Sequence, residues 1–167
     1  MAGGRRSAAA ERFVDLAETY CRLIDRRGKL GTEEFLNSVQ RVLPQLYATA
    51  IALSQGRRSN AEYPAPVDSW EPIWADLRES LGRWDVHWEG FHPYRLDPKD
   101  PMAGSLADDL ASIYRDLKRG LAIWSLGTPK ARRDAVWDLR YNFEIHWGRH
   151  VLVALRALHA RRFYLID

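Results

Sequence analysis

The sequence predicts an all-α fold: a helical bundle of about five helices with a long, aromatic-rich ordered loop between helices 3 and 4. Apolar residues recur at intervals of three and four in five stretches, which is the pattern of a helix with one buried face. Most of these stretches also begin or end at residues that favour helix termini. The alternation of apolar and polar residues that would indicate half-buried strands is absent from the sequence. The 167 residues are most simply one domain, 8–167, after a flexible N-terminal tail over 1–7.

The first two helices are predicted to form a hairpin. In 8–25 the apolar residues form one stripe, and the Arg26–Gly28 segment that follows is typical of a helix end. Thr32 is a suitable N-cap for a second helix, whose apolar stripe continues to Leu53. Pro44 lies off that stripe and predicts a kink, because proline removes a main-chain hydrogen bond.

The middle of the chain combines a short helix with an aromatic-rich segment. After a polar loop over 54–68, Ser69 is predicted to cap a helix over 70–82. The segment that follows, 83–104, holds four large aromatic residues among prolines and polar residues: Trp84, Trp88, Phe91 and Tyr94. Because such a cluster is rarely left in solvent, we expect an ordered loop packed on the helices, which covers the core or lines a site.

The last two predicted helices are joined by a short connection. The first, over 105–124, opens with the Ser-Leu-Ala-Asp form of a capping box. Thr128 is predicted to cap the second, over 129–160, which is followed by an apolar tail, 163–166, that we expect to dock or to bind a partner. Gly148 inside the last helix predicts the close approach of another backbone, because glycine is otherwise unfavourable there.

Composition argues against several classes of function. The chain has 25 basic and 22 acidic residues, which are interleaved, and its arginine pairs fall at predicted helix ends, so nucleic-acid binding is not expected. The single cysteine, Cys21, excludes a disulfide framework and any multi-cysteine metal site. No run approaches the roughly 18 apolar residues of a membrane span, and Glu11 and Arg12 interrupt the start before a signal core forms. We therefore expect a cytoplasmic protein without membrane association.

Two aspartates and two histidines are the principal candidate residues. Asp109 and Asp116 lie on one flank of the helix over 105–124. His146 and His150, four residues apart, share a flank of the last helix. Antiparallel helices joined by a short connection bring such flanks together, so we expect aspartate–histidine pairs between them. The ligand-binding candidates are these four and two neighbours from the same stretch of the last helix: Asp109, Asp116, Glu144, His146, Trp147 and His150.

Two interpretations of this cluster remain open. In the first, the protein is a non-catalytic binding or protein-interaction module without a cofactor, and the pairs fix the register of the last two helices. A protein partner, a second copy of the chain or a small ligand would then bind to it. In the second, it is a metal-assisted hydrolase that uses Glu144 as a base and four ligands, Asp109, Asp116, His146 and His150.

The absence of motifs favours the first interpretation. The sequence has no phosphate-binding glycine loop, nucleophile elbow, dinucleotide fingerprint or HExxH motif. No catalytic residue is therefore assigned, and a binding role is the preferred interpretation of the cluster.

Two segments together give the chain a family resemblance: Ser105–Leu121 and Phe143–His150. With both in place, the sequence resembles the bacterial domain-of-unknown-function family DUF5063 over nearly its full length. The resemblance implies a helical bacterial protein but no established activity, and it brings no catalytic residues. It implies tyrosine and aspartate where this chain has His87 and His92, so it gives these two histidines no chemical role.

Overall fold

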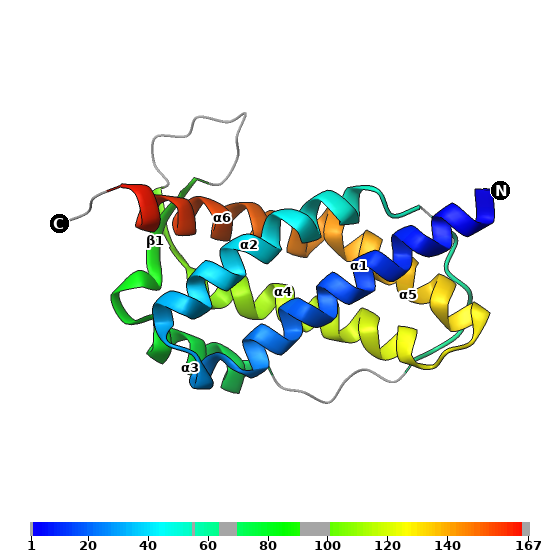
Figure 1. The fold of residues 1–167 in the computed structure, drawn as a ribbon, viewed down its shortest axis with the longest axis horizontal. Helices are drawn as coiled ribbons and strands as arrows, with labels where there is room; N and C mark the ends of the chain where they lie inside the picture. Colours follow the sequence, from blue (N-terminus) through cyan, green and yellow to red (C-terminus); the bar gives the residue numbers. More distant parts are fainter. Residues whose placement is uncertain (1, 55, 64–69, 91–100, 165–167) are drawn as a thin grey trace.

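The computed structural model describes residues 2–54, 56–63, 70–90 and 101–164, which fold into a helical bundle with one small antiparallel sheet (Figure 1). The all-α prediction is confirmed. The elements in chain order are α1 (Ala2–Asp25), η1 (Arg27–Lys29), α2 (Thr32–Ile51), α3 (Glu71–Leu81), η2 (Gly82–Trp84), β1 (Val86–Gly90), β2 (Pro101–Ser105), α4 (Leu106–Ser125), α5 (Pro129–Asn142), the π-helical turn η3 (Phe143–Trp147) and α6 (Gly148–Phe163). None of the helices in these ranges is both long and apolar enough to cross a membrane.

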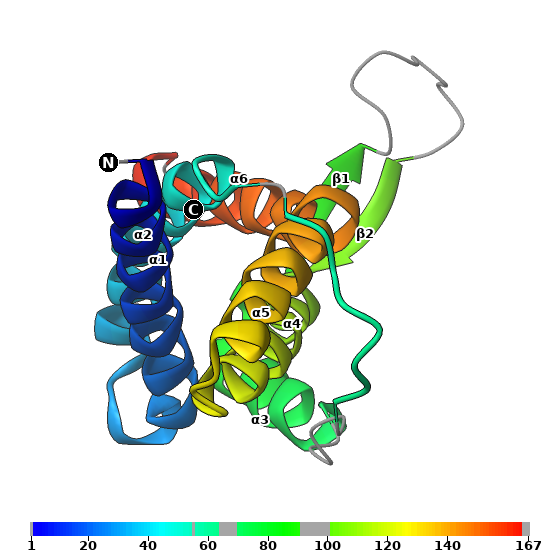
Figure 2. The same ribbon diagram turned by 90° about the vertical axis from the view of Figure 1, so that its right-hand side faces the viewer.

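Helix α4 is the central element of the bundle. It packs against α1, α3, α5 and α6, and accordingly it carries buried residues around most of its circumference. Helices α1 and α2 form the predicted hairpin, and Figure 2 shows this hairpin as a layer that faces α4 and α5. Helix α6 closes the arrangement by contacting both α2 and α4.

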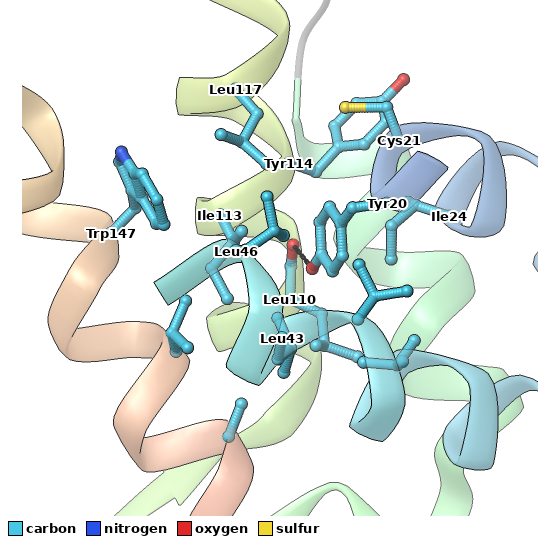
Figure 3. Close-up of a cluster of buried hydrophobic side chains, with 14 of the residues drawn as sticks. Tyr20, Cys21, Ile24, Leu43, Leu46, Leu110, Ile113, Tyr114, Leu117 and Trp147 are labelled. Carbon is cyan, nitrogen blue, oxygen red and sulfur yellow. Dashed lines mark hydrogen bonds between the residues drawn. The ribbon is translucent and has the colours of Figure 1, made fainter. Parts of the chain in front are cut away.

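The core lies between the hairpin and α4. Figure 3 shows apolar side chains from α1, α2 and α4 in contact there, with Trp147 on the far side. The Tyr20 hydroxyl lies in this core and donates a 2.8 Å hydrogen bond to the Leu110 carbonyl (Figure 3). Burial raises the pKa of Tyr20 well above its ordinary value of 10.0, so the hydroxyl stays a neutral donor.

Local sequence signals set most helix ends as predicted. The side chain of Ser105 accepts a hydrogen bond from the Asp108 amide, and that of Thr128 accepts one from the Ala131 amide. The start of α2 differs by one position: Thr32 is its first residue and Gly31 occupies the N-cap without a side-chain bond. Helix α1 begins at Ala2, inside the segment predicted as a tail. Ser69, the predicted cap of α3, lies outside the described residues.

The last predicted helix is interrupted by a π-helical turn. The amide of Gly148 donates to the carbonyl of Phe143, five residues earlier, where an α-helix would use a four-residue step. This turn also explains the glycine, because a Cβ at Gly148 would lie 2.4 Å from that same carbonyl oxygen. A backbone does approach Gly148 closely, but it belongs to the same helix and not, as predicted, to another one.

The aromatic-rich segment is where the structure departs most from the prediction. Instead of a loop packed on the helices, β1 and β2 form a two-stranded arm in which Trp88 is paired with Ala103. Trp84 is half-buried, but Val86 and Trp88 of the arm are 67% and 70% exposed. The prediction that all the aromatic side chains of this segment pack on the helices was therefore wrong. Phe91 and Tyr94 lie outside the described residues, as do His92 and the rest of 91–100.

Candidate ligand site

The two predicted aspartate–histidine pairs form between α4 and the last helix. Asp109 Oδ1 lies 2.7 Å from His150 Nδ1, and Asp116 Oδ2 lies 2.7 Å from His146 Nδ1. The two imidazole rings contact each other with their centroids 4.8 Å apart. The carboxylates accept these hydrogen bonds, so each pair joins α4 to the segment that follows α5. The pairing predicted from the sequence is therefore confirmed.

The two pairs differ in their access to solvent. The Asp109–His150 pair is buried on both sides, whereas the His146 side chain is 35% exposed. Arg115 approaches the second carboxylate as well, with its Nε 3.8 Å from Asp116 Oδ1. Because solvent screens a charge at the surface, the first pair depends more strongly on both of its partners than the second.

The four residues do not form the single metal site of the hydrolase interpretation. Asp109 and Asp116 are two helical turns apart, which separates them by roughly 10 Å along α4. Each carboxylate accepts a hydrogen bond from a different imidazole. Within the described ranges, no three or more histidine, cysteine, aspartate or glutamate side chains lie where they could share an ion. The four residues of this alternative interpretation thus lie as two separate aspartate–histidine pairs.

Two further candidates have other partners. Glu144 Oε1 accepts a 2.7 Å hydrogen bond from Arg140 Nε, and the same guanidinium donates to the carbonyls of Ala50 and Ile51 at the end of α2. This pair therefore satisfies a helix C-terminus. Trp147 is fully buried and donates from Nε1 to the Leu139 carbonyl at 3.1 Å, which makes it a core residue.

A third imidazole, His87 of β1, completes the buried cluster. Its Nε2 lies 3.6 Å from Asp109 Oδ2, so Asp109 stands between His87 and His150. The side chain of His87 is 14% exposed, and neither ring nitrogen has a hydrogen-bond partner in the described part of the chain. Sequence alone did not place His87 in this cluster, because the position of this residue depends on the arm, which was not predicted.

Asp85 fixes the arm, and with it His87, to the start of α4. Its carboxylate Oδ1 accepts hydrogen bonds from the Ser105 hydroxyl and the Ala107 amide, each at 2.8 Å. Its own carbonyl accepts a third, from the Leu106 amide at 2.8 Å. A buried carboxylate at a helix N-terminus is favourable there because it meets the free amides of the first turn. His87 follows two residues later and is positioned by these contacts.

A groove lies beside His87, between the arm and the C-terminal half of α6. We call it the arm groove; its volume is about 580 Å³. The residues that line it come from η2, β1, α6 and the residue after α6: Trp84, Val86, His87, Trp88, Arg156, Ala157, His159, Ala160, Arg161 and Tyr164. None of the six predicted candidates is among these lining residues. The signals that could have found the groove were the tryptophans before 90 and the aromatic C-terminal tail.

Arg161 is a charged residue in the wall of the arm groove, and its side chain is largely buried. Its two terminal nitrogens donate to the carboxylate of Glu33, and its guanidinium carbon lies 5.5 Å from the Trp84 ring centroid. The hydrogen bond from Arg161 lowers the pKa of Glu33 below its ordinary value of 4.5. The side chain of Arg161 is only 9% exposed, and its Nε has no hydrogen-bond partner among the described residues.

A smaller hollow lies along α5 and, like the arm groove, is lined by arginine, tryptophan and tyrosine residues. Its volume is about 340 Å³, and Trp137 and Tyr141 stack in its wall with centroids 4.8 Å apart. The segment 56–63 is held near it by Asp134, which accepts hydrogen bonds from Ser59 and Tyr63. This α5 hollow is lined by Arg58, Tyr63, Arg119, Ile123, Trp137, Asp138, Tyr141 and Asn142.

Comparison with known proteins places the chain in a family without naming an activity. No curated protein matches its sequence. Its structure is similar to the crystal structure of protein BF1032 from Bacteroides fragilis, with a TM-score of 0.78 and 24% identity over 92% of this chain and 91% of that one. A likeness at this identity shows the fold alone. The model of a family described as a domain of unknown function, DUF5063, matches residues 5–163, and the chain therefore belongs to the DUF5063 family.

Proposed function

We propose that this protein is a non-catalytic binding module and that the arm groove is its binding site. The observation that carries the proposal is a groove of about 580 Å³ with mainly apolar and aromatic walls, bordered by a tryptophan that is 70% exposed. Sites for small ligands have volumes of this order and combine apolar walls with a few polar groups. A large exposed aromatic side chain beside such a groove is typical of a surface that is covered on binding.

The surroundings of the arm groove support a preformed site. On one side, Asp85 ties the arm to the first turn of α4 through three hydrogen bonds. On the other, Arg161 ties α6 to α2 through Glu33. A groove whose two walls are held separately loses little conformational freedom when a ligand binds, which favours affinity.

The aspartate–histidine pairs have a supporting role in this proposal. Asp109 and His150 lie behind His87 and are engaged with each other, as are Asp116 and His146. They hold α4 against the last helix and thereby fix the distance between the arm and α6. Their removal is expected to affect folding stability first and binding second.

A fragment screen tests the proposal. Saturation-transfer NMR with a library of small aromatic fragments is carried out on the wild type, on Trp88→Ala and on Trp137→Ala, the matched control in the α5 hollow. We expect fragments that bind the wild type to lose their signal with Trp88→Ala and to keep it with Trp137→Ala. If the fragments still bind Trp88→Ala, or if none binds the wild type, the arm groove is not the site.

A further inference from the structure

We propose that the arm groove recognises the carboxylate of a small aromatic carboxylic acid through His87 and Arg161. This inference rests on the proposed function and adds the chemical class of the ligand. It is carried by buried hydrogen-bonding atoms on both walls of one groove that have no hydrogen-bond partner among the described residues.

His87 and Arg161 both have buried nitrogen atoms that form no hydrogen bond with the described residues. Arg161 Nε and both ring nitrogens of His87 are buried, and within the described residues none of them has a hydrogen-bond partner. More than nine in ten buried polar groups in folded proteins are paired, because leaving one unpaired costs about 1–3 kcal/mol. His87 belongs to β1 and Arg161 to α6, and both line the arm groove. An acceptor bound between them would satisfy both walls at once.

The charges around the groove select an anion. Its described lining residues include two arginines and two histidines, Arg156, Arg161, His87 and His159, but no aspartate or glutamate. The two terminal nitrogens of Arg161 each donate to Glu33, so the direction of its Nε–H is fixed. A charge-assisted hydrogen bond to a fixed guanidinium is about twice as strong as a neutral one.

The same charges favour a carboxylate over a phosphate. Glu33 already neutralises much of the charge of Arg161, which leaves a site suited to one negative charge. The groove is bordered by the last turn of α6, where the negative end of the helix dipole opposes any anion, and opposes a dianion more strongly than a single charge. Phosphate sites commonly use a helix N-terminus, and the helix end here has the opposite polarity.

His87 is suited to an anion because its other side faces a carboxylate. Its Nε2 is directed to Asp109, 3.6 Å away, whose second oxygen already accepts from His150. An imidazole in this position can donate a hydrogen bond from Nδ1 to the ligand while its Nε2 faces Asp109.

The apolar walls account for the aromatic part of the ligand. Trp84, Trp88 and Tyr164 border the groove, and the last two are 70% and 62% exposed. A planar ring placed against exposed aromatic side chains removes apolar area from water and gains a stacking contribution of about 0.5–1.5 kcal/mol for each pair. The ligand therefore needs a flat apolar body with the carboxylate at one end.

Calorimetric titration with 2-naphthoate and its neutral isostere 2-naphthamide tests the inference. We expect the wild type to bind naphthoate at least about tenfold more tightly than naphthamide, the ratio that one charge-assisted hydrogen bond supplies. In Arg161→Gln and in His87→Gln, naphthoate affinity should fall to the naphthamide level, while naphthamide affinity stays within about twofold. Arg119→Gln, which removes an arginine from the α5 hollow, should leave both affinities unchanged, and circular dichroism verifies that each variant is folded.

The outcomes separate the two proposals. Equal binding of naphthoate and naphthamide, with both lost in Trp88→Ala, would overturn the carboxylate inference and leave the binding site in place. Binding of neither compound to the wild type would overturn the inference, and the fragment screen would then decide the proposed function separately. Tighter binding of 2-naphthyl phosphate than of 2-naphthoate would overturn the assignment of the head group.

Discussion

Single carboxylates hold this protein together in several different ways. Asp85 accepts hydrogen bonds from the first turn of a helix, Asp134 holds an irregular segment, and Asp109 and Asp116 each accept from an imidazole. All four are buried, and burial of an ionised group is unfavourable unless its oxygens are satisfied. The loss of stability on removing one of these carboxylates therefore depends on whether its hydrogen-bond partner is left buried or can be solvated.

The two aspartate–histidine pairs are predicted to differ in their contribution to stability. Asp109→Ala leaves a buried imidazole without its partner and should lower the free energy of unfolding by about 3–5 kcal/mol. Asp116→Ala should cost only about 1–2 kcal/mol, because His146 can be solvated instead. Urea unfolding of the two variants measures this difference, and an equal or reversed ranking would contradict it.

Asp134 should make stability depend on acid pH. Burial raises its pKa, but hydrogen bonds from Ser59 and Tyr63 outweigh that effect and hold the pKa below its ordinary value of 3.8. A lowered folded-state pKa gives stability that is fully present above the ordinary value and is lost as pH falls through the folded value. Asp134→Asn should therefore be less stable than the wild type at pH 7, and the difference should shrink below about pH 4. A difference that stays constant in urea titrations from pH 7 to pH 3 would contradict this.

At the scale of elements, the sequence predicted the features that depend on residues close together in the chain, namely the helices and their N-caps. The stripes of α1, α2 and α4 and the caps at Ser105 and Thr128 follow local rules of periodicity and hydrogen bonding. The aspartate–histidine pairing followed as well, because a short connection forces two helices to lie antiparallel. The arm did not follow: its strands are five residues each, and β2 reads Pro-Met-Ala-Gly-Ser, without β-branched or aromatic residues.

The spacing of the buried residues around the π-helical turn differs from the spacing expected for a regular α-helix. Leu139, Phe143, Trp147 and Val151 are all buried and are separated by three successive four-residue steps. On an α-helix each such step advances the position by about 40°, so three steps would carry the stripe away from the core. The extra residue in the π-helical turn corrects this drift and keeps all four facing inward.

Gly148 should be essential to that turn. Gly148→Ala would place a Cβ 2.4 Å from the Phe143 carbonyl oxygen, and we expect it to lower the free energy of unfolding by at least about 2 kcal/mol. Gly28→Ala is the matched control, since nothing lies within 4 Å of its Cβ, and it should change stability by less than about 1 kcal/mol. Thermal and urea unfolding of both variants give the comparison; equal effects would show that the turn accepts a side chain.

At the scale of the whole molecule, the arm groove and the α5 hollow are distinct places on one bundle. They share no lining residue, and Figure 1 places β1 and the C-terminal end of α6 at one end of the long axis, with α5 toward the other. The arm groove joins residues about 70 positions apart in sequence, which is why no local pattern could predict it. The predicted aspartate–histidine cluster adjoins the arm groove because Asp109 faces His87, which lines the groove. The sequence therefore predicted residues behind the groove but not the residues that line it.

The most direct test of the binding site is to locate a bound ligand. The indole N–H signals of the seven tryptophans, followed by ¹H–¹⁵N NMR while 2-naphthoate is added, report on both hollows and on the core in one titration. We expect the signals of Trp84 and Trp88 to move together with increasing ligand, while those of Trp137 and Trp147 stay in place. Movement of the Trp137 signal with Trp84 and Trp88 unchanged would contradict the assignment of the arm groove as the binding site.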